Sequence, residues 1–302
     1  MTTASGPVRP HGRPQNTALG IVLTMLAMLC FAAMDATSKW LVADYPVGQM
    51  MFIRCALVLL FTYFFVRRVG LRRVFITRRP GLQIVRSLIW VIESAMFVLA
   101  FKFLPLADTH ALASSSPLIV IVMAIVFLGE RASPARWIAV AAAFAGVLLI
   151  LRPGFRTLDW PLLLPVVGAF LWAGYQILTR LAQREDTPET SMIWSSLVSF
   201  LAAALIGWID WTWPTPTAWA LMVFVALLGA IAHYALIKAF DVAEAGVVQP
   251  YSYTLLVFVT ILGVVLFGDV PDKFTIIGAG VVVASGLFAW HHDRKAANAA
   301  KR

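Results

Sequence analysis

The chain has 302 residues, of which 61% are hydrophobic and only 13% are charged. Soluble domains are about 45–50% apolar and about 25% charged, so this composition excludes a soluble globular fold and indicates a membrane protein. The formal net charge of +9 does not indicate nucleic-acid binding, because the basic residues lie between apolar runs and not along one helix face. We therefore expect a lipid bilayer as a partner, and no nucleic acid.

Ten apolar runs are long enough to cross the hydrocarbon core of a bilayer, which takes about 20 helical residues. The expected spans cover residues 18–38, 47–66, 82–104, 107–128, 134–151, 161–180, 190–209, 217–238, 246–267 and 273–291. The sequence thus predicts an all-α membrane protein with ten transmembrane helices. Residues 1–15 are polar and hold three prolines, so we expect a flexible cytoplasmic tail there and not a signal peptide. Residues 293–302 are expected to form a second cytoplasmic tail.

The distribution of basic residues predicts the orientation of these spans, because lysine and arginine are enriched in cytoplasmic loops. If the N-terminus lies in the cytoplasm, most of the lysines and arginines fall on the cytoplasmic side, and segment 67–79 holds the largest group of them. An even number of spans then places both termini in the cytoplasm. We expect a multi-pass protein of the cell inner membrane.

A short pattern ends two of the apolar runs. Phe-Leu-Gly-Glu occupies residues 127–130, and Leu-Phe-Gly-Asp occupies residues 266–269. Each run is entered through a proline, Pro117 or Pro250. Because each half of the chain holds five spans, an odd number, the second half must be inserted in the opposite sense. Two inverted five-helix repeats are typical of secondary transporters that work by alternating access.

Several stretches carry a family resemblance. They are Met-Asp-Ala-Thr-Ser-Lys at residues 34–39, Leu-Pro-Leu-Ala-Asp at 104–108, the run from 116 to 130 with Arg-Pro-Gly at 152–154, and the run from 250 to 271. In this order on ten spans they resemble the drug/metabolite transporter superfamily, in its ten-helix EamA-type branch. The resemblance covers residues 18–291, although Asp269 stands where glutamate is commoner.

The resemblance implies one EamA-type repeat over residues 16–155 and a second over residues 156–292. It also implies a secondary carrier of a small-molecule substrate, which needs no cofactor and is not an enzyme. The sequence holds no phosphate-binding loop for ATP. A membrane-embedded enzyme is the alternative class, with His110 near Asp108 as its candidate catalytic group. A channel is a third class, against which the inverted repeat argues.

Substrates differ between branches of this family, so two alternatives stay open. We favour export of an amino-acid-like or opine-type metallophore compound, and the alternative is uptake of a vitamin-like heterocycle such as riboflavin. A polycarboxylate would need a basic partner within the spans, where Arg54 and Arg86 are the candidates. A flavin would need aromatic stacking, for which Trp90, Trp172 and Tyr251 are available.

Glu93 is the strongest candidate for a substrate-site residue, because ionisable groups inside a membrane normally face a cavity or a partner. It lies near the middle of its span, and Trp90, Ser94 and Phe97 share its helical face. We expect Glu93 to bind substrate and to couple transport to a proton. The alternative is a protonated carboxyl that only bonds neighbouring helices together.

Further substrate-binding candidates lie in three later spans. They are Trp172, Tyr175 and Gln176 in 161–180, His233 in 217–238, and Gln249, Tyr251 and Ser252 around Pro250 in 246–267. A proline inside a span frees backbone groups, and a pair of such spans in corresponding places indicates a central site. Serines at 114–116 directly precede Pro117, the corresponding proline of the first half. The competing explanation is that these polar groups only join helices. We expect no metal site.

Charged residues lie near the outer ends of the first two spans. Asp35, Lys39 and Arg54 are expected to form ion pairs that anchor the helix ends. Alternatively, they form an outer gate whose ion pairs break as the carrier opens.

Two other features are expected to be structural. Arg86 lies near the cytoplasmic end of its span, so its side chain is expected to snorkel toward the membrane surface. Small residues from Ala141 to Gly146 and around Gly278 favour close contact between helices. This contact either joins the two halves of the chain or forms a homodimer.

Overall fold

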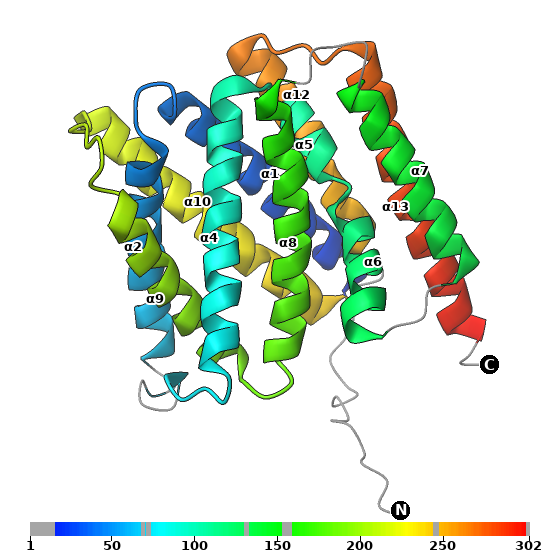
Figure 1. Ribbon diagram of the computed structural model, residues 1–302, viewed down its shortest axis with the longest axis horizontal. Helices are drawn as coiled ribbons and strands as arrows, with labels where there is room; N and C mark the ends of the chain where they lie inside the picture. The colour runs from blue at the N-terminus through cyan, green and yellow to red at the C-terminus, as the bar shows by residue number, and fades with distance from the viewer. Residues whose placement is uncertain are drawn as a thin grey trace, which may run out of the picture.

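The computed structural model describes residues 16–67, 70, 74–129, 133–152, 159–243 and 248–299, which form helices joined by short connections (Figure 1). The α-helices are α1 (Thr17–Leu41), α2 (Val47–Val66), α4 (Pro80–Phe103), α5 (Leu106–Ala113), α6 (Ser116–Leu128), α7 (Pro134–Leu151), α8 (Leu163–Ala182), α9 (Pro188–Ile206), α10 (Pro216–Val242), α12 (Thr254–Phe267) and α13 (Lys273–Ala299). The 3-10 helices η1 (Trp160–Leu162) and η2 (Gln249–Tyr253) precede α8 and α12. The predicted tail over residues 1–15, Glu130 and the expected repeat boundary at 155–156 lie outside the described residues.

Ten of the described helical segments are long and apolar enough to cross a membrane, which confirms the predicted number of spans. Their limits agree with the expected ranges to within a few residues. α5 and α6 together form one span, and η2 forms another with α12. α13 continues as a helix to Ala299, so most of the predicted C-terminal tail is helical. Alanine and lysine, both strong helix formers, account for this extension.

The two interrupted spans break at their prolines. α5 ends at Ala113, and α6 begins at Ser116, one residue before Pro117. Pro250 lies inside η2, so the corresponding span of the second half begins as 3-10 helix. Proline has no backbone N–H, so regular α-helical bonding cannot run through it. Both predicted interruptions are therefore present.

The repeated four-residue pattern ends a helix in each half. Gly129 caps α6 with φ of +68°, and Gly268 caps α12 with φ of +69°. Residues with a Cβ atom are strained in this left-handed conformation, which explains the glycine in both copies. After Gly268 the backbone turns back, and the N–H of Asp269 donates to the carbonyl oxygen of Gly263 at 3.1 Å.

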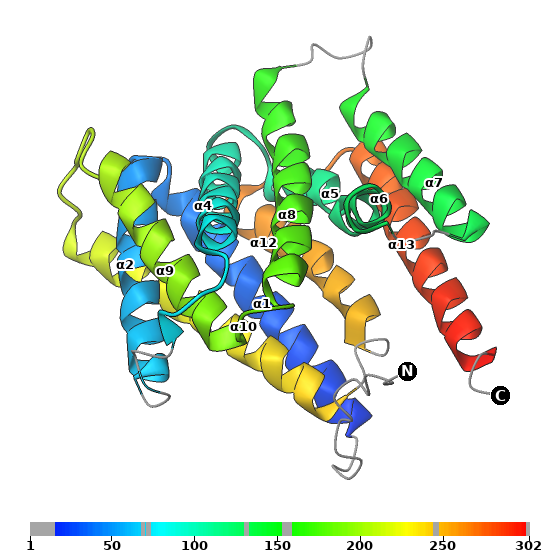
Figure 2. The same cartoon turned by 60° about the horizontal axis from the view of Figure 1, so that its bottom comes forward.

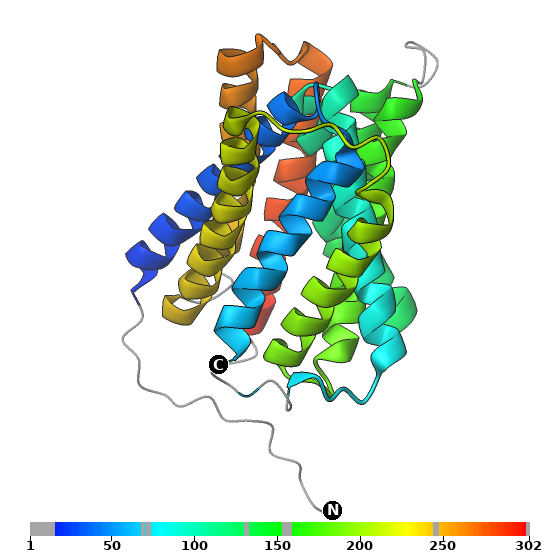
Figure 3. The ribbon, with the colours of Figure 1, turned by 90° about the vertical axis from the view of Figure 1, so that its left-hand side faces the viewer.

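The helices pack in pairs that join the two halves of the chain. α1 lies against α10, α4 against α8, α2 against α9, and α7 against α13. Figure 3 shows α1 and α10 side by side. Helices that lie five spans apart are counterparts in the two halves, so α1 corresponds to α8, α4 to α10 and α6 to α12. The contact of α1 with α10 then corresponds to that of α8 with α4, and the contact of α1 with α12 corresponds to that of α8 with α6. We call the end of the bundle where α1 begins, at Thr17, the N-side, and the end where α1 stops, at Leu41, the far side.

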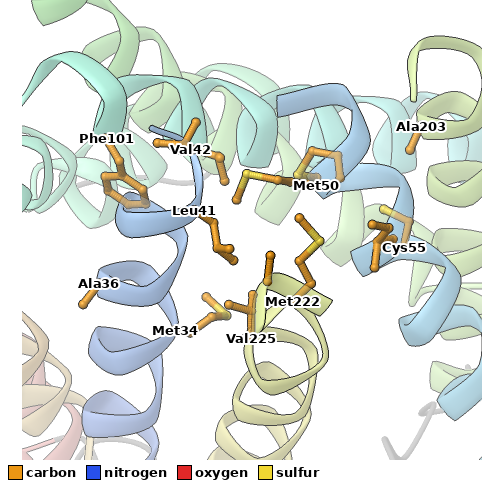
Figure 4. Packing of buried hydrophobic residues seen from close by; sticks show 14 of the residues in the cluster. Met34, Ala36, Leu41, Val42, Met50, Cys55, Phe101, Ala203, Met222 and Val225 are labelled. Atoms are coloured by element: carbon orange, nitrogen blue, oxygen red, sulfur yellow. The ribbon is translucent and has the colours of Figure 1, made fainter. Parts of the chain in front are cut away.

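A core of apolar side chains lies where α1, α2 and α10 meet (Figure 4). Leu41, Met50 and Met222 belong to it, one from each helix, and all three are buried. Unbranched methionine side chains adapt to irregular gaps between helices. Lipid tails are as apolar as these side chains, so the hydrophobic effect does not drive helices together inside a membrane. Close van der Waals packing stabilises the helix pairs instead. The core therefore ties α10 to the first two helices of the other half.

The α7–α13 pair stands at one side of the bundle (Figures 1 and 2). A Cβ atom added to Gly146 would lie 2.8 Å from the carbonyl oxygen of Gly278, and one added to Gly278 would lie 2.5 Å from Cγ1 of Ile150. Real Cβ atoms do not come this close to their neighbours, so the crossing requires glycine on both helices. The small residues thus join the two halves, which is one of the two uses expected from the sequence.

Candidate functional site

A cavity of about 540 Å³ lies between helices of both halves. Its volume falls within the range of about 300–1,000 Å³ that small-molecule sites occupy. None of its described lining residues belongs to α7, α9 or α13. The predicted residues that line it are Asp35, Arg54, Trp90, Glu93, Ser94, Phe97, Trp172, Tyr175, His233 and Ser252.

The helical face predicted on α4 is present at the cavity wall. Trp90, Glu93, Ser94 and Phe97 follow one another at helical spacing, and all four line the cavity. Gly168 of α8 makes room for this face, because a Cβ atom there would lie 2.9 Å from Cε2 of Phe97. The glycine therefore allows the Phe97 ring to lie close to the α8 backbone.

Three of the predicted substrate-binding residues are not among the described lining residues. Gln176 follows Tyr175 on α8 and lies about 100° further round the helix, away from the face that Tyr175 presents. Tyr251 lies in η2, where Tyr253 lines the cavity in its place. The side chain of Gln249 lies outside the described part of the structure.

Arg54 and Glu93 are two of the charged residues that line the cavity. Glu93 is buried, with 9% of its surface exposed, and the Ser94 hydroxyl donates to its Oε2 atom at 3.3 Å. Arg54 lines the same cavity as Glu93 and His233. Its guanidinium lies 5.8 Å from the centroid of the Trp90 ring, where the electron-rich face of the indole stabilises a cation.

Asp35 and His110 form a contact that the sequence did not predict. Oδ2 of Asp35 lies 3.1 Å from Nε2 of His110, and the His110 ring stacks on Phe101 with centroids 6.0 Å apart. All three residues line the cavity. The sequence signals His110 only as a histidine one turn into an apolar span. Nothing in the sequence indicates that it meets Asp35, which lies on a different span.

The expected ion pair between Asp35 and Lys39 is not formed, although the two residues lie one turn apart on α1. Nζ of Lys39 lies 3.0 Å from Oδ2 of Asp269 and 2.7 Å from the carbonyl oxygen of Leu104. Leu104 caps the C-terminus of α4, where unsatisfied carbonyl groups carry partial negative charge and attract a lysine. Lys39 therefore joins the far-side ends of α1, α4 and α12.

The expectation that Arg86 snorkels is wrong. The residue is 2% exposed, and its guanidinium lies 5.4 Å from the centroid of the Tyr175 ring. Its hydrogen-bond acceptors are Gln83 Oε1 at 2.8 Å, the Ser191 carbonyl at 2.8 Å, Ser195 Oγ at 2.7 Å, Thr179 Oγ1 at 3.3 Å and Tyr175 Oη at 3.4 Å. Because α4, α8 and α9 supply these acceptors inside the protein, the side chain does not need to reach the membrane surface.

Aromatic rings form much of the cavity wall. Trp172 stacks on Tyr175 with centroids 5.4 Å apart, and Phe31 meets His233 edge-on at 5.0 Å. Nδ1 of His233 lies 2.7 Å from the carbonyl oxygen of Gly229, so it is the donor, and Nε2 of the neutral ring is left as an acceptor. The other aromatic lining residues are Trp90, Phe97, Phe101 and Tyr253. Such a wall fits a flat, partly apolar solute.

Comparison with known proteins gives the family. The EamA-like transporter family matches this chain twice, over residues 18–152 and 159–290. A riboflavin transporter from Rhizobium johnstonii is 31% identical over 241 residues, which cover 79% of this chain and 80% of that protein. The pseudopaline exporter CntI from Pseudomonas aeruginosa is 27% identical over 234 residues, which cover 76% of this chain and 81% of that protein. A solved protein structure with 19% identity and a TM-score of 0.63 covers 92% of this chain and 98% of its own chain, and it shows likeness of fold alone.

The two matched segments cover most of the chain, and each contains five of the ten candidate spans. The family resemblance carried by the sequence motifs is therefore confirmed. This protein is a multi-pass membrane transporter of a small molecule, not an enzyme, and it belongs to the EamA-like transporter family.

Proposed function

We propose that this protein takes up a flat, vitamin-like heterocycle such as riboflavin. The observation that carries the proposal is the aromatic lining, in which Arg54 is the one lysine or arginine among the described lining residues. Export of an opine-type polycarboxylate, which we favoured from the sequence, would need several basic partners. Arg86, the other candidate, donates to protein acceptors and is not among the described lining residues.

The charge of the cavity supports the same substrate class. Asp35 and Glu93 line it together with Arg54, so two acids face one base when both acids are ionised. A solute with several carboxylates would be repelled there. A neutral heterocycle would find polar partners in Arg54 and Glu93 and stacking partners in Trp90 and Trp172. The similarity to a riboflavin transporter points to this class as well.

The two halves are proposed to be inverted repeats, over residues 16–155 and 156–292, in the cell inner membrane. The exchange of helix contacts between the halves supports this arrangement, as does the odd number of spans in each half. Basic residues in segment 67–79 support a cytoplasmic N-side and two cytoplasmic termini. The far side of the bundle is then the outer side.

Transport by alternating access would require the outer end of the bundle to open and close. Lys39 joins three helix ends there through Asp269 and Leu104, and we name these three residues the outer latch. Opening toward the outside would break both contacts of Lys39. The latch would re-form once substrate occupies the cavity and the protein turns toward the cytoplasm.

Uptake of radiolabelled riboflavin tests the proposal, in a bacterial strain that can neither make nor import flavins. The wild-type protein is expected to give saturable uptake. Trp172→Ala should abolish it by removing a stacking partner, whereas Arg54→Gln keeps a hydrogen-bond donor and should reduce it less. No flavin uptake, together with an opine released into the medium, would instead favour the exporter.

A further inference from the structure

Arg86 is a buried cation at the N-side of the bundle. Its guanidinium is linked to the carboxylate of Asp186 through the Gln83 side chain. Oε1 of Gln83 accepts from Arg86 at 2.8 Å, and Nε2 of Gln83 donates to Oδ2 of Asp186 at 2.8 Å. An amide thus relays the interaction between a base and an acid.

The acid end of this relay is held in place by the loop before α4. The Thr77 hydroxyl donates to Oδ2 of Asp186, and the backbone N–H of Arg78 donates to Oδ1 at 3.2 Å. Because Nε2 of Gln83 donates to both Asp186 and Ser191, its carbonyl oxygen must face Arg86. The position of the guanidinium is therefore determined from the N-side.

The other end of Arg86 reaches the cavity wall. Nη1 donates to Oη of Tyr175 at 3.4 Å and to Thr179 at 3.3 Å, while the guanidinium lies over the Tyr175 ring. Tyr175 in turn stacks on Trp172, with an angle of 28° between the rings. Both aromatic residues line the cavity.

We propose that Arg86 is a positioning residue that holds Tyr175 and Trp172 as one flat wall of the substrate site. It acts through Tyr175 and does not touch the substrate, since it is not among the described lining residues. The planar, forked guanidinium suits this task, because it bonds α8 and α9 at once and stacks on a ring. The inference rests on the proposed function for the identity of the ligand, but the wall itself is present without one.

Arg86→Lys tests the proposal, because it keeps the positive charge and loses the fork. We expect KM for riboflavin uptake to rise roughly tenfold, with kcat changed much less, because a misplaced wall weakens binding of the ring. Ser199→Ala is the matched control. The Ser199 hydroxyl lies at the same α4–α9 contact, 3.5 Å from the Ser87 carbonyl, and its loss should leave KM unchanged.

A double-mutant cycle separates positioning from general packing. Tyr175→Phe keeps the ring and removes only the hydroxyl group that accepts from Arg86. If Arg86 acts through this contact, the two substitutions together should raise KM less than the product of their separate effects. Independent effects that multiply, or a wild-type KM in Arg86→Lys, would overturn the proposal. If Arg86→Lys does not fold, a wild-type KM in Tyr175→Phe would overturn it.

A readout without substrate distinguishes this proposal from the proposed function. The fluorescence of Trp172 is isolated by subtracting, from the emission spectrum of each protein, the emission spectrum of the same protein carrying Trp172→Phe. We expect this difference spectrum to change in Arg86→Lys and not in Ser199→Ala. A changed spectrum in a protein that binds no riboflavin would leave the positioning role standing and refute the substrate. An unchanged spectrum would refute the positioning role, whatever the substrate.

Discussion

Gly168 is a single residue on which the width of the cavity depends. A Cβ atom at this position would lie 2.9 Å from Cε2 and 3.1 Å from Cδ2 of Phe97. Gly168→Ala should therefore push the ring toward the cavity and raise the Kd for riboflavin several-fold, roughly 1 kcal/mol of binding free energy. Quenching of flavin fluorescence by the purified protein measures this Kd. Gly174→Ala on the same helix meets no atom within 4 Å, so an equal effect there would contradict the explanation.

Asp186 makes the stability of the N-side depend on pH. Burial alone would raise the pKa of this carboxyl, but the hydrogen bonds from Thr77, Gln83 and the Arg78 backbone outweigh it, so the pKa lies below its ordinary value. A carboxyl with a lowered folded pKa stabilises the fold above its unfolded pKa of about 3.9. That contribution is lost as the pH falls through the folded pKa.

Asp186→Asn should lower the free energy of unfolding by about 1.5–3 kcal/mol at neutral pH, the usual contribution of hydrogen bonds to a charged group. Thermal unfolding in detergent measures the loss as a lower Tm, and the gap from wild type should close in acid. A gap that stays constant with pH would contradict the role of the ionised carboxylate. Glu185→Gln is the control, because the Arg79–Glu185 ion pair is partly exposed and such pairs contribute about 0–1 kcal/mol.

At the scale of helices, we expect the proposed outer latch to control whether the outer end of the bundle is closed. Lys39→Gln and Asp269→Asn should both favour the outward-open form, because each removes the ion pair at 3.0 Å. Labelling of Ser38→Cys by a membrane-impermeant maleimide measures the opening, since Ser38 is buried beside the latch. Both substitutions should speed labelling about tenfold, and their combination no further.

Lys102→Gln is the control for the latch, because Lys102 is exposed near the same end of α4. Faster labelling in this variant would show that the charge of the outer surface matters, and not the latch. Slower transport is expected in the latch variants, since a carrier that stays open on one side completes fewer cycles.

Helical periodicity predicted the parts of the site that lie within one helix. The α4 face with Trp90, Glu93 and Phe97 is an example, because positions three and four residues apart must share a side. Periodicity does not say which ends of distant helices meet. For that reason Lys39 was paired with Asp35, its neighbour on α1, and its contact with Asp269 was missed. Arg86 was placed at the membrane surface for the same reason, because its acceptors on α8 and α9 lie about 90 to 110 residues away along the chain.

At the scale of the whole molecule, coupling requires that a proton and the solute use the same cavity. We propose that Glu93 carries this proton, since it is buried and lines the cavity together with Arg54 and Asp35. Glu93→Gln should abolish accumulation of riboflavin against a gradient and remove the dependence of uptake on pH between about 5.5 and 8. Counterflow, which needs no net proton movement, should persist.

Asp44→Asn is the control for this prediction, because Asp44 is an exposed acid on the far side. It should retain both accumulation and pH dependence. Wild-type accumulation by Glu93→Gln at every pH would remove Glu93 from the coupling role.

The crossing of α7 and α13 at Gly146 and Gly278 lies apart from the substrate. Neither helix contributes a described lining residue. Their backbones nevertheless approach so closely that neither Gly146 nor Gly278 has room for a side chain. Substitutions of the rings and charges around the cavity should therefore leave the α7–α13 contact undisturbed. This one contact between the halves and the surface that binds the solute are therefore built from different helices.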